Sequence, residues 1–229
     1  MDAAAATHDD MTAPGALAPE ASALSPEASA LAPEDAMRAD LYELLASLLR
    51  APPDAAMLRA LAALEGDETE LGRAVDALAR IAATTGEAEA AREYHDLFIG
   101  VGRGELVPYG SYYLTGFLNE KPLGLLRRDM ARLGIERATG VREPEDHAGG
   151  LMEMMAGLVR GTLGTGNAAD ASMLHAAHVE PWAGHFFADL ERARGSRLYA
   201  PVGTIGRHFM AVETEARAMA ASEGQVPAA

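Results

Sequence analysis

Residues 40–53 read Asp40-Leu-Tyr-Glu-Leu-Leu-Ala-Ser-Leu-Leu-Arg-Ala-Pro-Pro53 and carry the clearest structural signal in the chain. Leucines at positions 41, 44, 45, 48 and 49 recur every three or four residues, which is the spacing of one face of an α-helix. The Pro52-Pro53 pair ends this pattern because proline cannot continue a helix. The stretch therefore predicts an amphipathic helix that begins near Glu34 and ends before Pro52.

The same spacing recurs along the rest of the chain. Apolar stripes, divided by glycine and proline, predict further helices at about 54–64, 68–84, 87–99, 111–118, 123–133, 144–163, 169–193 (two helices broken near Pro181) and 201–221. Residues 111–118 fit a strand or a helix by periodicity, and Ser111 as an N-cap favours the helix. No segment alternates apolar and polar residues over a sustained length. The sequence predicts an all-α fold, a single globular helical domain of about nine to ten helices.

The first 33 residues differ from this body. They are rich in Ala and Pro and repeat a seven-residue unit: Leu17-Ala-Pro-Glu-Ala-Ser-Ala, Leu24-Ser-Pro-Glu-Ala-Ser-Ala and Leu31-Ala-Pro-Glu34. A proline in every unit forbids a continuous helix, and one leucine per unit buries too little surface to offset the ordering entropy. We predict a disordered tail over residues 1–33, a helical domain over 34–223 and a disordered C-terminus over 224–229.

The composition excludes several classes of protein. The chain has no cysteine, which excludes disulfides, thiolate metal sites, iron–sulfur ligation and a cysteine nucleophile. The net charge is −15, and seven of the acidic residues lie in residues 1–35, which hold no Lys or Arg. The rest of the chain therefore carries a net charge of about −8, and an acidic surface does not bind the phosphates of nucleic acid. Residues 1–12 lack the basic start and apolar stretch of a secretory signal, and no apolar run approaches the ~20 residues that cross a bilayer. We predict a cytoplasmic protein without stable membrane insertion.

Two stretches suggest ligand sites but lack the required context. The run Gly100-Val-Gly-Arg-Gly-Glu105 is glycine-rich, but a phosphate-binding loop joins a strand to a helix and ends in Lys-Ser/Thr, so we interpret it as a connector. His175, His178 and His185 suggest a metal site, but Pro181 separates His185 and no His-Glu-x-x-His pair defines a geometry. We predict histidines on a helix surface, with no metal and no cofactor.

The segment Glu143-Pro144-Glu145-Asp146-His147 permits two interpretations. Proline at the first helical position and carboxylates in the first turn are typical of a helix N-terminus. That interpretation leaves His147 unexplained, one turn into the helix and beside carboxylates, where Asp146 and His147 could act as an acid–base pair. The chain offers no nucleophile, cofactor loop or metal cage to work with such a pair, so we predict no catalytic residue.

Aromatic residues cluster upstream of that segment. Six of the twelve aromatic residues lie between Tyr94 and Phe117. They occur in Tyr94-His-Asp-Leu-Phe98 and then in Pro108-Tyr109-Gly-Ser111-Tyr112-Tyr113. A local hydrophobic core and a partly exposed surface for a peptide are both compatible with this cluster.

Together these segments resemble the TorD/DmsD/NarJ family of redox-enzyme maturation chaperones. The family pattern pairs Tyr-x-x-Leu-Phe and Pro-aromatic-x-Ser-x-Tyr with a downstream Glu-Pro-x-Asp-His. This chain carries the pattern, in order and over about 55 residues, as Tyr94, Leu97, Phe98, Pro108, Tyr109, Ser111, Tyr112, Glu143, Pro144, Asp146 and His147. It departs from some relatives at Tyr109, where they have Trp, and its N-terminal repeats lie outside the pattern.

The resemblance implies a chaperone without turnover. Such proteins bind the twin-arginine signal peptide, or the apo-form, of a molybdopterin oxidoreductase subunit and hold it until the cofactor is inserted before export. The expected partners are therefore such a leader and the apo catalytic subunit of a molybdenum oxidoreductase. The run from Tyr112 to Leu123 is similar to family members associated with formate dehydrogenases, with dimethyl sulfoxide and trimethylamine N-oxide reductases as alternative clients.

The resemblance also implies a peptide groove between the 94–113 surface and the 143–147 segment. The predicted peptide-binding residues are the eleven of the pattern together with Glu145. Carboxylates of Glu143, Glu145 or Asp146 would accept two hydrogen bonds from each guanidinium, because arginine prefers planar carboxylates. Phe98, Tyr109 and Tyr112 would line the groove for the apolar part of the leader, and His147 would orient Asp146 or sense occupancy.

Two other functions remain open from the sequence. One is a helical scaffold or regulator that binds no leader, and the other is a metal-dependent or acid–base enzyme that uses Asp146 and His147. Small residues in the later helices, such as Gly157 and Gly161, permit close helix packing and hence either a monomer or a helix-swapped dimer.

Overall fold

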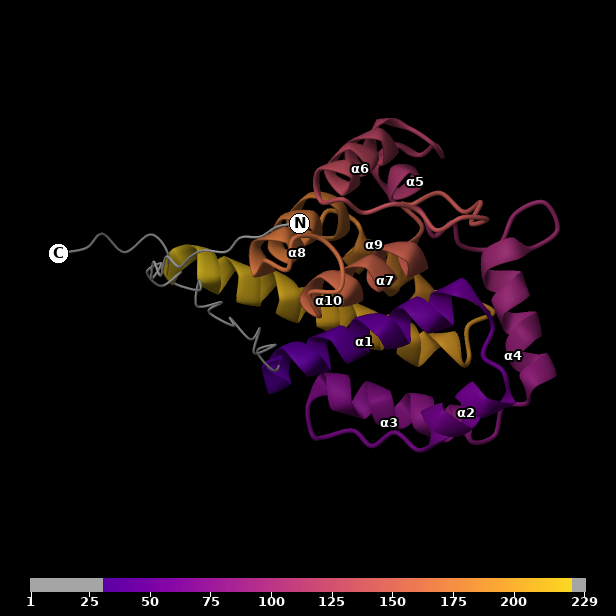
Figure 1. The fold of residues 1–229 in the computed structure, drawn as a ribbon. Helices are drawn as coiled ribbons and strands as arrows, with labels where there is room; N and C mark the ends of the chain where they lie inside the picture. The colour runs from indigo at the N-terminus through magenta and orange to yellow at the C-terminus, as the bar shows by residue number, and fades with distance from the viewer. Residues whose placement is uncertain (1–30, 224–229) are drawn as a thin grey trace, which may run out of the picture. The chain divides into compact units, whose positions relative to one another are not determined.

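The computed structural model describes residues 31–223, and every regular element within them is a helix (Figure 1). The elements are α1 (Pro33–Arg50), α2 (Ala55–Ala62), α3 (Glu70–Ala82), α4 (Glu87–Tyr94), the π-helical turn η1 (His95–Ile99), α5 (Gly110–Thr115), α6 (Lys121–Arg132), α7 (Ala148–Val159), α8 (Ala168–Leu174), the π-helical turn η2 (His175–Val179), α9 (Ala183–Arg192) and α10 (Tyr199–Glu223). The all-α prediction is confirmed. The predicted disorder over residues 1–30 and 224–229 lies outside the described residues, and α1 begins at the last residue of the predicted tail.

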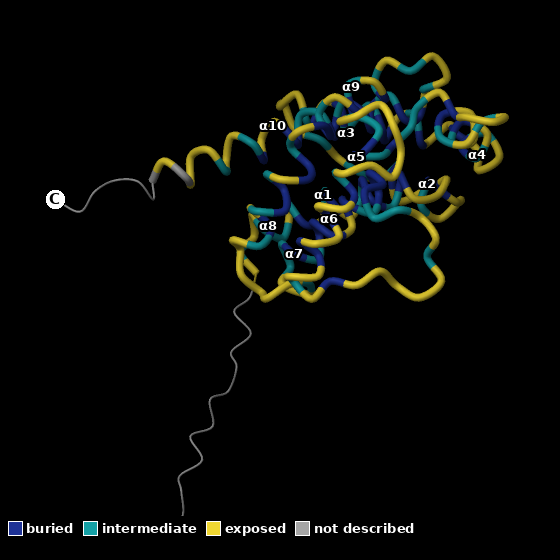
Figure 2. The backbone as a smooth tube through the Cα atoms, turned by 90° about the horizontal axis from the view of Figure 1, so that it is seen from above, coloured by how far each residue is buried: buried dark blue, intermediate teal, exposed yellow. Residues whose placement is uncertain are grey.

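The core forms where α1 packs along α7 and where α10 packs against α9 and α3 (Figure 1). Large side chains that are fully buried include Tyr42, Trp182, Phe186 and Tyr199. Burial of a side chain such as Phe186 contributes about 1.5–3 kcal/mol through the hydrophobic effect. Buried residues gather where these helices meet, whereas α10 beyond Met210 is largely exposed (Figure 2). Within residues 31–223 no helix combines the length and apolarity needed to cross a bilayer.

Short polar residues cap the N-termini of α2 and α3. The Asp54 side chain accepts a hydrogen bond of 2.8 Å from the Met57 N–H at the start of α2. Thr69 accepts one of 3.0 Å from the Gly72 N–H at the start of α3. These N-caps satisfy backbone donors that have no partner within the helix, and each contributes about 1 kcal/mol.

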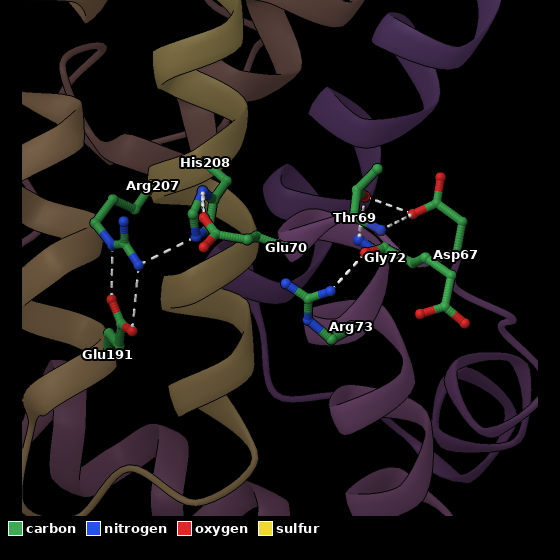
Figure 3. A network of polar contacts seen from close by, with 9 residues as sticks. Asp67, Thr69, Glu70, Gly72, Arg73, Glu191, Arg207 and His208 are labelled. Carbon is green, nitrogen blue, oxygen red and sulfur yellow. Dashed lines mark hydrogen bonds and ion pairs between the residues drawn. The ribbon is translucent and has the colours of Figure 1, made fainter.

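A polar network joins α10 to its two neighbours (Figure 3). Arg207 of α10 donates from Nε to Glu191 of α9 at 2.8 Å, and this hydrogen bond lowers the pKa of Glu191. The adjacent His208 lies with Nδ1 3.4 Å from a carboxylate oxygen of Glu70 in α3. α10 therefore links α9 and α3 through both its apolar face and its polar face.

The two helices that follow the motif segments start at other residues than predicted. The helix predicted over 144–163 begins at Ala148 with His147 as its N-cap, so Pro144, Glu145 and Asp146 precede the helix. α5 begins at Gly110 with Tyr109 as its N-cap, so the prediction that Ser111 is the N-cap is wrong. The N-cap residues of these two helices, Tyr109 and His147, pair with each other through their backbones.

The prediction of surface histidines is wrong for two of the three. His175 and His178 lie in η2 with exposed fractions of 2% and 9%, whereas His185 is exposed on α9. His178 Nε2 lies 2.9 Å from Asp129 of α6, which covers this side of η2. Periodicity within one helix does not show which other helix covers its polar face. Among the described residues, no group of three or more His, Asp or Glu side chains is placed to hold a metal ion.

Candidate functional site

A short antiparallel β-bridge brings the two motif segments together. Tyr109 pairs with His147, although 38 positions separate them in the sequence. The Gly110 N–H donates to the Asp146 carbonyl at 2.9 Å, and the Ala148 N–H donates to the Pro108 carbonyl at 2.8 Å. The bridge fixes the start of α5 against the start of α7.

Asp146 holds the first turn of α5 from across this bridge. Its side chain is 3% exposed, and its Oδ2 accepts a hydrogen bond of 2.7 Å from the N–H of Ser111, which is itself fully buried. The first N–H groups of a helix have no partner within it, so this carboxylate acts as a cap supplied by another segment. Its second oxygen, Oδ1, is buried without a hydrogen-bond partner among the described residues.

His147 is the N-cap of α7 and is held in one tautomer. Its Nδ1 accepts a hydrogen bond of 3.1 Å from the Gly149 N–H, so in the neutral ring the proton lies on Nε2. Burial lowers the pKa of His147, while the neighbouring Glu143 carboxylate acts to raise it. Asp146 and His147 each bind a backbone N–H and do not bond to each other, so they do not form the acid–base pair that one interpretation of the sequence required.

Tyr109 connects His147 to Glu143. The two rings meet edge to face with centroids 5.1 Å apart. The Tyr109 hydroxyl donates to Glu143 Oε1, and burial together with this carboxylate raises the pKa of Tyr109 well above its ordinary value. Glu143 is exposed and is thereby held in place beside the half-buried Tyr109.

Glu145 is engaged within the protein. Its Oε2 accepts from Arg127 of α6 at 2.8–2.9 Å, and Arg137 lies 3.7 Å from its other oxygen. Burial acts to raise the pKa of Glu145, but the hydrogen bond and charge of Arg127 outweigh it, and the net shift is downward. Glu145 therefore ties the 135–147 segment to α6.

Beside these residues lies a cavity of about 350 Å³, which we call the carboxylate cavity. Its acidic lining residues are Glu136, Glu143, Glu145 and Glu153, and its basic lining residues are Arg50 and Arg137. Its apolar lining residues include Met130, Ile135, Met154 and Leu163, with Tyr94, Pro144 and His147 beside them. With His147 neutral, four carboxylates face two guanidiniums of the lining, and Arg127, which pairs with Glu145 from outside the lining, reduces the excess to one negative charge on an apolar wall.

The remaining predicted residues lie away from this cavity. Leu97, Pro108 and Ser111 are buried. Phe98 is half-buried and packs edge to face on Tyr94 and Tyr199, with ring centroids 5.1 and 5.4 Å away. Tyr112 is half-buried under the Arg103 guanidinium, which lies 5.7 Å from its ring centre. None of the three aromatic residues predicted to line the groove, Phe98, Tyr109 and Tyr112, lines the carboxylate cavity, whereas Tyr94 does.

Asp146 faces a different cavity, of about 320 Å³, which it lines together with Leu114, Leu125 and Trp182. His178 also lines this cavity, and its hydrogen bond to Asp129 lowers the pKa of Asp129. Asp146 and His147 are adjacent in the sequence, yet their side chains line separate cavities. The motif therefore does not present its three carboxylates to one ligand.

Four charged residues that line the carboxylate cavity were not predicted from the sequence: Arg50, Glu136, Arg137 and Glu153. Arg50 and Glu153 are charged residues on α1 and α7, where a polar position is ordinary on the exposed face of a helix. Glu136 and Arg137 belong to a loop that shows no periodicity. None of these positions carries a local signal. The proximity of Arg50 to Glu153 depends on the packing of α1 against α7.

Comparisons with known proteins agree with this architecture. The model of the family described as nitrate reductase delta subunit matches residues 64–188, which is more than half of the chain. The chaperone protein TorD of Aliivibrio fischeri is 28% identical over 137 residues, which cover 53% of this chain and 64% of that relative. A solved structure from Archaeoglobus fulgidus, described as a redox enzyme maturation protein, superposes with a TM-score of 0.54 at 22% identity and covers 76% of this chain and 94% of its own.

The last of these likenesses concerns the fold alone. The chain spans less than two thirds of the TorD relative. The match of the family model, together with the Tyr94–Tyr112 and Glu143–His147 segments, shows that this chain belongs to the nitrate reductase delta subunit family, the TorD/DmsD/NarJ family of redox-enzyme maturation chaperones.

Proposed function

We propose that this protein is a cytoplasmic chaperone that binds the twin-arginine leader, or the apo-form, of a molybdopterin oxidoreductase subunit and holds it until the cofactor is inserted before export. The observation that carries the proposal is the carboxylate cavity, where excess negative charge and an apolar wall meet beside the motif. A twin-arginine leader offers the complementary chemistry, two guanidiniums followed by an apolar stretch. The client is a formate dehydrogenase or a dimethyl sulfoxide or trimethylamine N-oxide reductase.

Glu143 is the motif carboxylate best suited to a guanidinium. It is exposed and lines the cavity, and Tyr109 holds one of its oxygens in place. A carboxylate in this position can accept two parallel hydrogen bonds from arginine, which lysine cannot reproduce. Glu145 is bound by Arg127 and Asp146 is buried, so their role is to position the segment that carries Glu143.

The apolar part of the leader has a matching surface in the same cavity. Met130 and Met154 line it together with Ile135 and Leu163. Methionine side chains adapt to irregular apolar partners because they are unbranched and polarizable. Such a wall accepts apolar stretches of differing sequence, which suits a binding protein that recognises a leader by its charge and hydrophobicity.

Calorimetric titration with a twin-arginine leader peptide and with its Lys-Lys counterpart tests the proposal. We expect the Arg-Arg peptide to bind about tenfold more tightly, equivalent to about 1.4 kcal/mol, because the ammonium group lacks the bidentate fork. Glu143→Gln is expected to remove most of this difference. Glu65→Gln makes the same charge change on an exposed residue between α2 and α3 and should leave it intact. Equal affinity of the wild-type protein for the two peptides would contradict the proposal.

A further inference from the structure

The carboxylate cavity adjoins a second cavity between α1 and α7. This interhelical cavity has a volume of about 470 Å³ and is lined by small residues such as Ala46, Ala156 and Gly157 and by the charged residues Glu43, Arg50, Glu153 and Arg160. The two cavities share Arg50, Glu153 and Leu163 as lining residues. Arg50 and Glu153 form an ion pair with each other. The boundary between the cavities is therefore made in part by one arginine–carboxylate pair.

Arg50 lies across the start of α7. It is the last residue of α1, and its Cγ lies only 2.7 Å from the position that a Cβ on Gly149 would occupy. Its stem thus packs on the bare backbone of Gly149, which only a glycine permits at this distance. The ends of the pair remain accessible, because the Arg50 and Glu153 side chains are 42% and 61% exposed.

The Arg50 charge acts on the same groups as the motif carboxylate. Burial lowers the pKa of His147, and Arg50 lowers it further, whereas Glu143 raises it. Burial raises the pKa of Tyr94, Glu143 raises it further, and Arg50 lowers it. Arg50 lines the carboxylate cavity together with Glu143, His147 and Tyr94, where a positively charged ligand would also lie.

We propose that Arg50 is an internal substitute for the leader arginine: it occupies Glu153 while the site is empty, and a leader guanidinium takes its place on Glu153. When Arg50 moves away, the two cavities join into one groove. The leader arginines then lie at Glu143 and Glu153, and the apolar stretch contacts the Met130 and Met154 wall of the carboxylate cavity. This inference rests on the proposed function and assigns a regulatory role to Arg50 and a binding role to Glu153, neither of which belongs to the sequence motif.

The exchange has a defined energetic consequence. A leader arginine that displaces Arg50 gains a carboxylate but must first break an existing ion pair, so the apparent affinity is lowered by the fraction of time that Arg50 occupies Glu153. An exposed pair of this kind is weak, so removal of Arg50 should tighten leader binding by about threefold. The gain must vanish when Glu153 is also neutral, because the two residues act through one contact.

The test is calorimetric titration of the full chain with the twin-arginine leader peptide. The variants are Arg50→Gln, Glu153→Gln and the double variant. Arg197→Gln is the matched control, because Arg197 loses the same charge from an exposed ion pair with Glu89 and lines neither cavity. Arg50→Lys keeps the charge without the planar fork and provides a second variant if Arg50→Gln folds poorly.

We expect Arg50→Gln to bind about threefold more tightly than the wild type, Arg50→Lys to fall between them, and Arg197→Gln to change affinity by less than about twofold. Glu153→Gln should weaken binding, and the double variant should bind no more tightly than Glu153→Gln. If the wild type binds the leader but Arg50→Gln binds equally or less tightly, the inference is overturned and the proposed function stands. If neither protein binds, both are overturned, and binding by Arg50→Gln alone would support both.

Discussion

The two ends of α1 each carry an arginine paired with a glutamate, and the two pairs differ in nearly every respect. Near the N-terminal end, Arg38 donates from Nε and Nη2 to the two oxygens of Glu213 at 2.7 and 2.8 Å, and Tyr42 donates to the same carboxylate at 2.8 Å. The Glu213 side chain is 4% exposed. At the other end, Arg50 makes a single contact with Glu153, which is 61% exposed.

The burial of an arginine–glutamate pair, rather than its residue types, decides whether the pair is fixed or replaceable. Glu213 is almost fully buried, so the carboxylate needs both of its partners and the pair is fixed. Hydrogen bonding to Glu213 raises the pKa of Arg38 far above its ordinary value. Water can solvate Glu153 at little cost, so the Arg50 contact is replaceable. The first pair holds the fold, and we assign the second to ligand exchange.

Breaking the two pairs should therefore have unequal effects on stability. We expect Glu213→Ala to lower the free energy of unfolding by about 3 kcal/mol, because it leaves the buried Tyr42 hydroxyl and the Arg38 guanidinium without their acceptor. Glu153→Ala should cost less than about 0.5 kcal/mol. Urea denaturation of both variants measures the difference, and similar losses would show that the comparison is wrong.

The same contrast applies to two carboxylates within the motif. Asp146→Ala should cost about 2 kcal/mol because the buried Ser111 N–H loses its acceptor, and Asp146→Asn should cost less because an acceptor oxygen remains. Glu143→Gln should change stability little and act on leader affinity. Denaturation and titration of the same three variants separate the positioning role from the binding role. A stable Asp146→Ala protein that has lost affinity alone would reverse these assignments.

The free energy of unfolding should also depend on pH, with a smaller effect, through two buried histidines. Burial lowers the pKa of His147 at the site and of His175, whose surroundings include Glu213 and Arg38. The unfolded chain, with a histidine pKa of about 6.5, then takes up protons first as the pH falls, so stability is full above about pH 6.5 and declines toward the lower folded-state pKa. Each histidine lowers the free energy of unfolding by up to about 1.4 kcal/mol as the pH falls from about 7.5 to about 5.5.

The His147→Asn variant measures how much of this loss of stability comes from His147. Asparagine preserves an acceptor for the N-cap of α7 but does not titrate. Denaturation midpoints measured across this pH range should fall less steeply for the variant than for the wild type. An unchanged slope would mean that His147 is not held neutral in the folded protein.

The sequence predicted the helices far better than it predicted the site. The leucine spacing at 41–49 placed α1 correctly, because this signal is local. The motif also indicated that residues around Tyr109 and His147 belong together. It did not reveal that Asp146 faces another cavity from His147, since the bridge at Tyr109 lets adjacent side chains point to different cavities.

The order of the helices, the family membership and the acidic, cysteine-free composition follow from the amino-acid sequence alone, because periodicity, motif spacing and charge are properties of the chain. The partner of each charged side chain was decided by tertiary structure. Arg38, Arg50 and Arg127 are alike in sequence as polar positions on helices, yet one is bound by a buried carboxylate, one by an exposed carboxylate and one by a motif residue. Packing of α1 against α7 and of α10 beside α9 sets those distances and burials, and no local pattern records them.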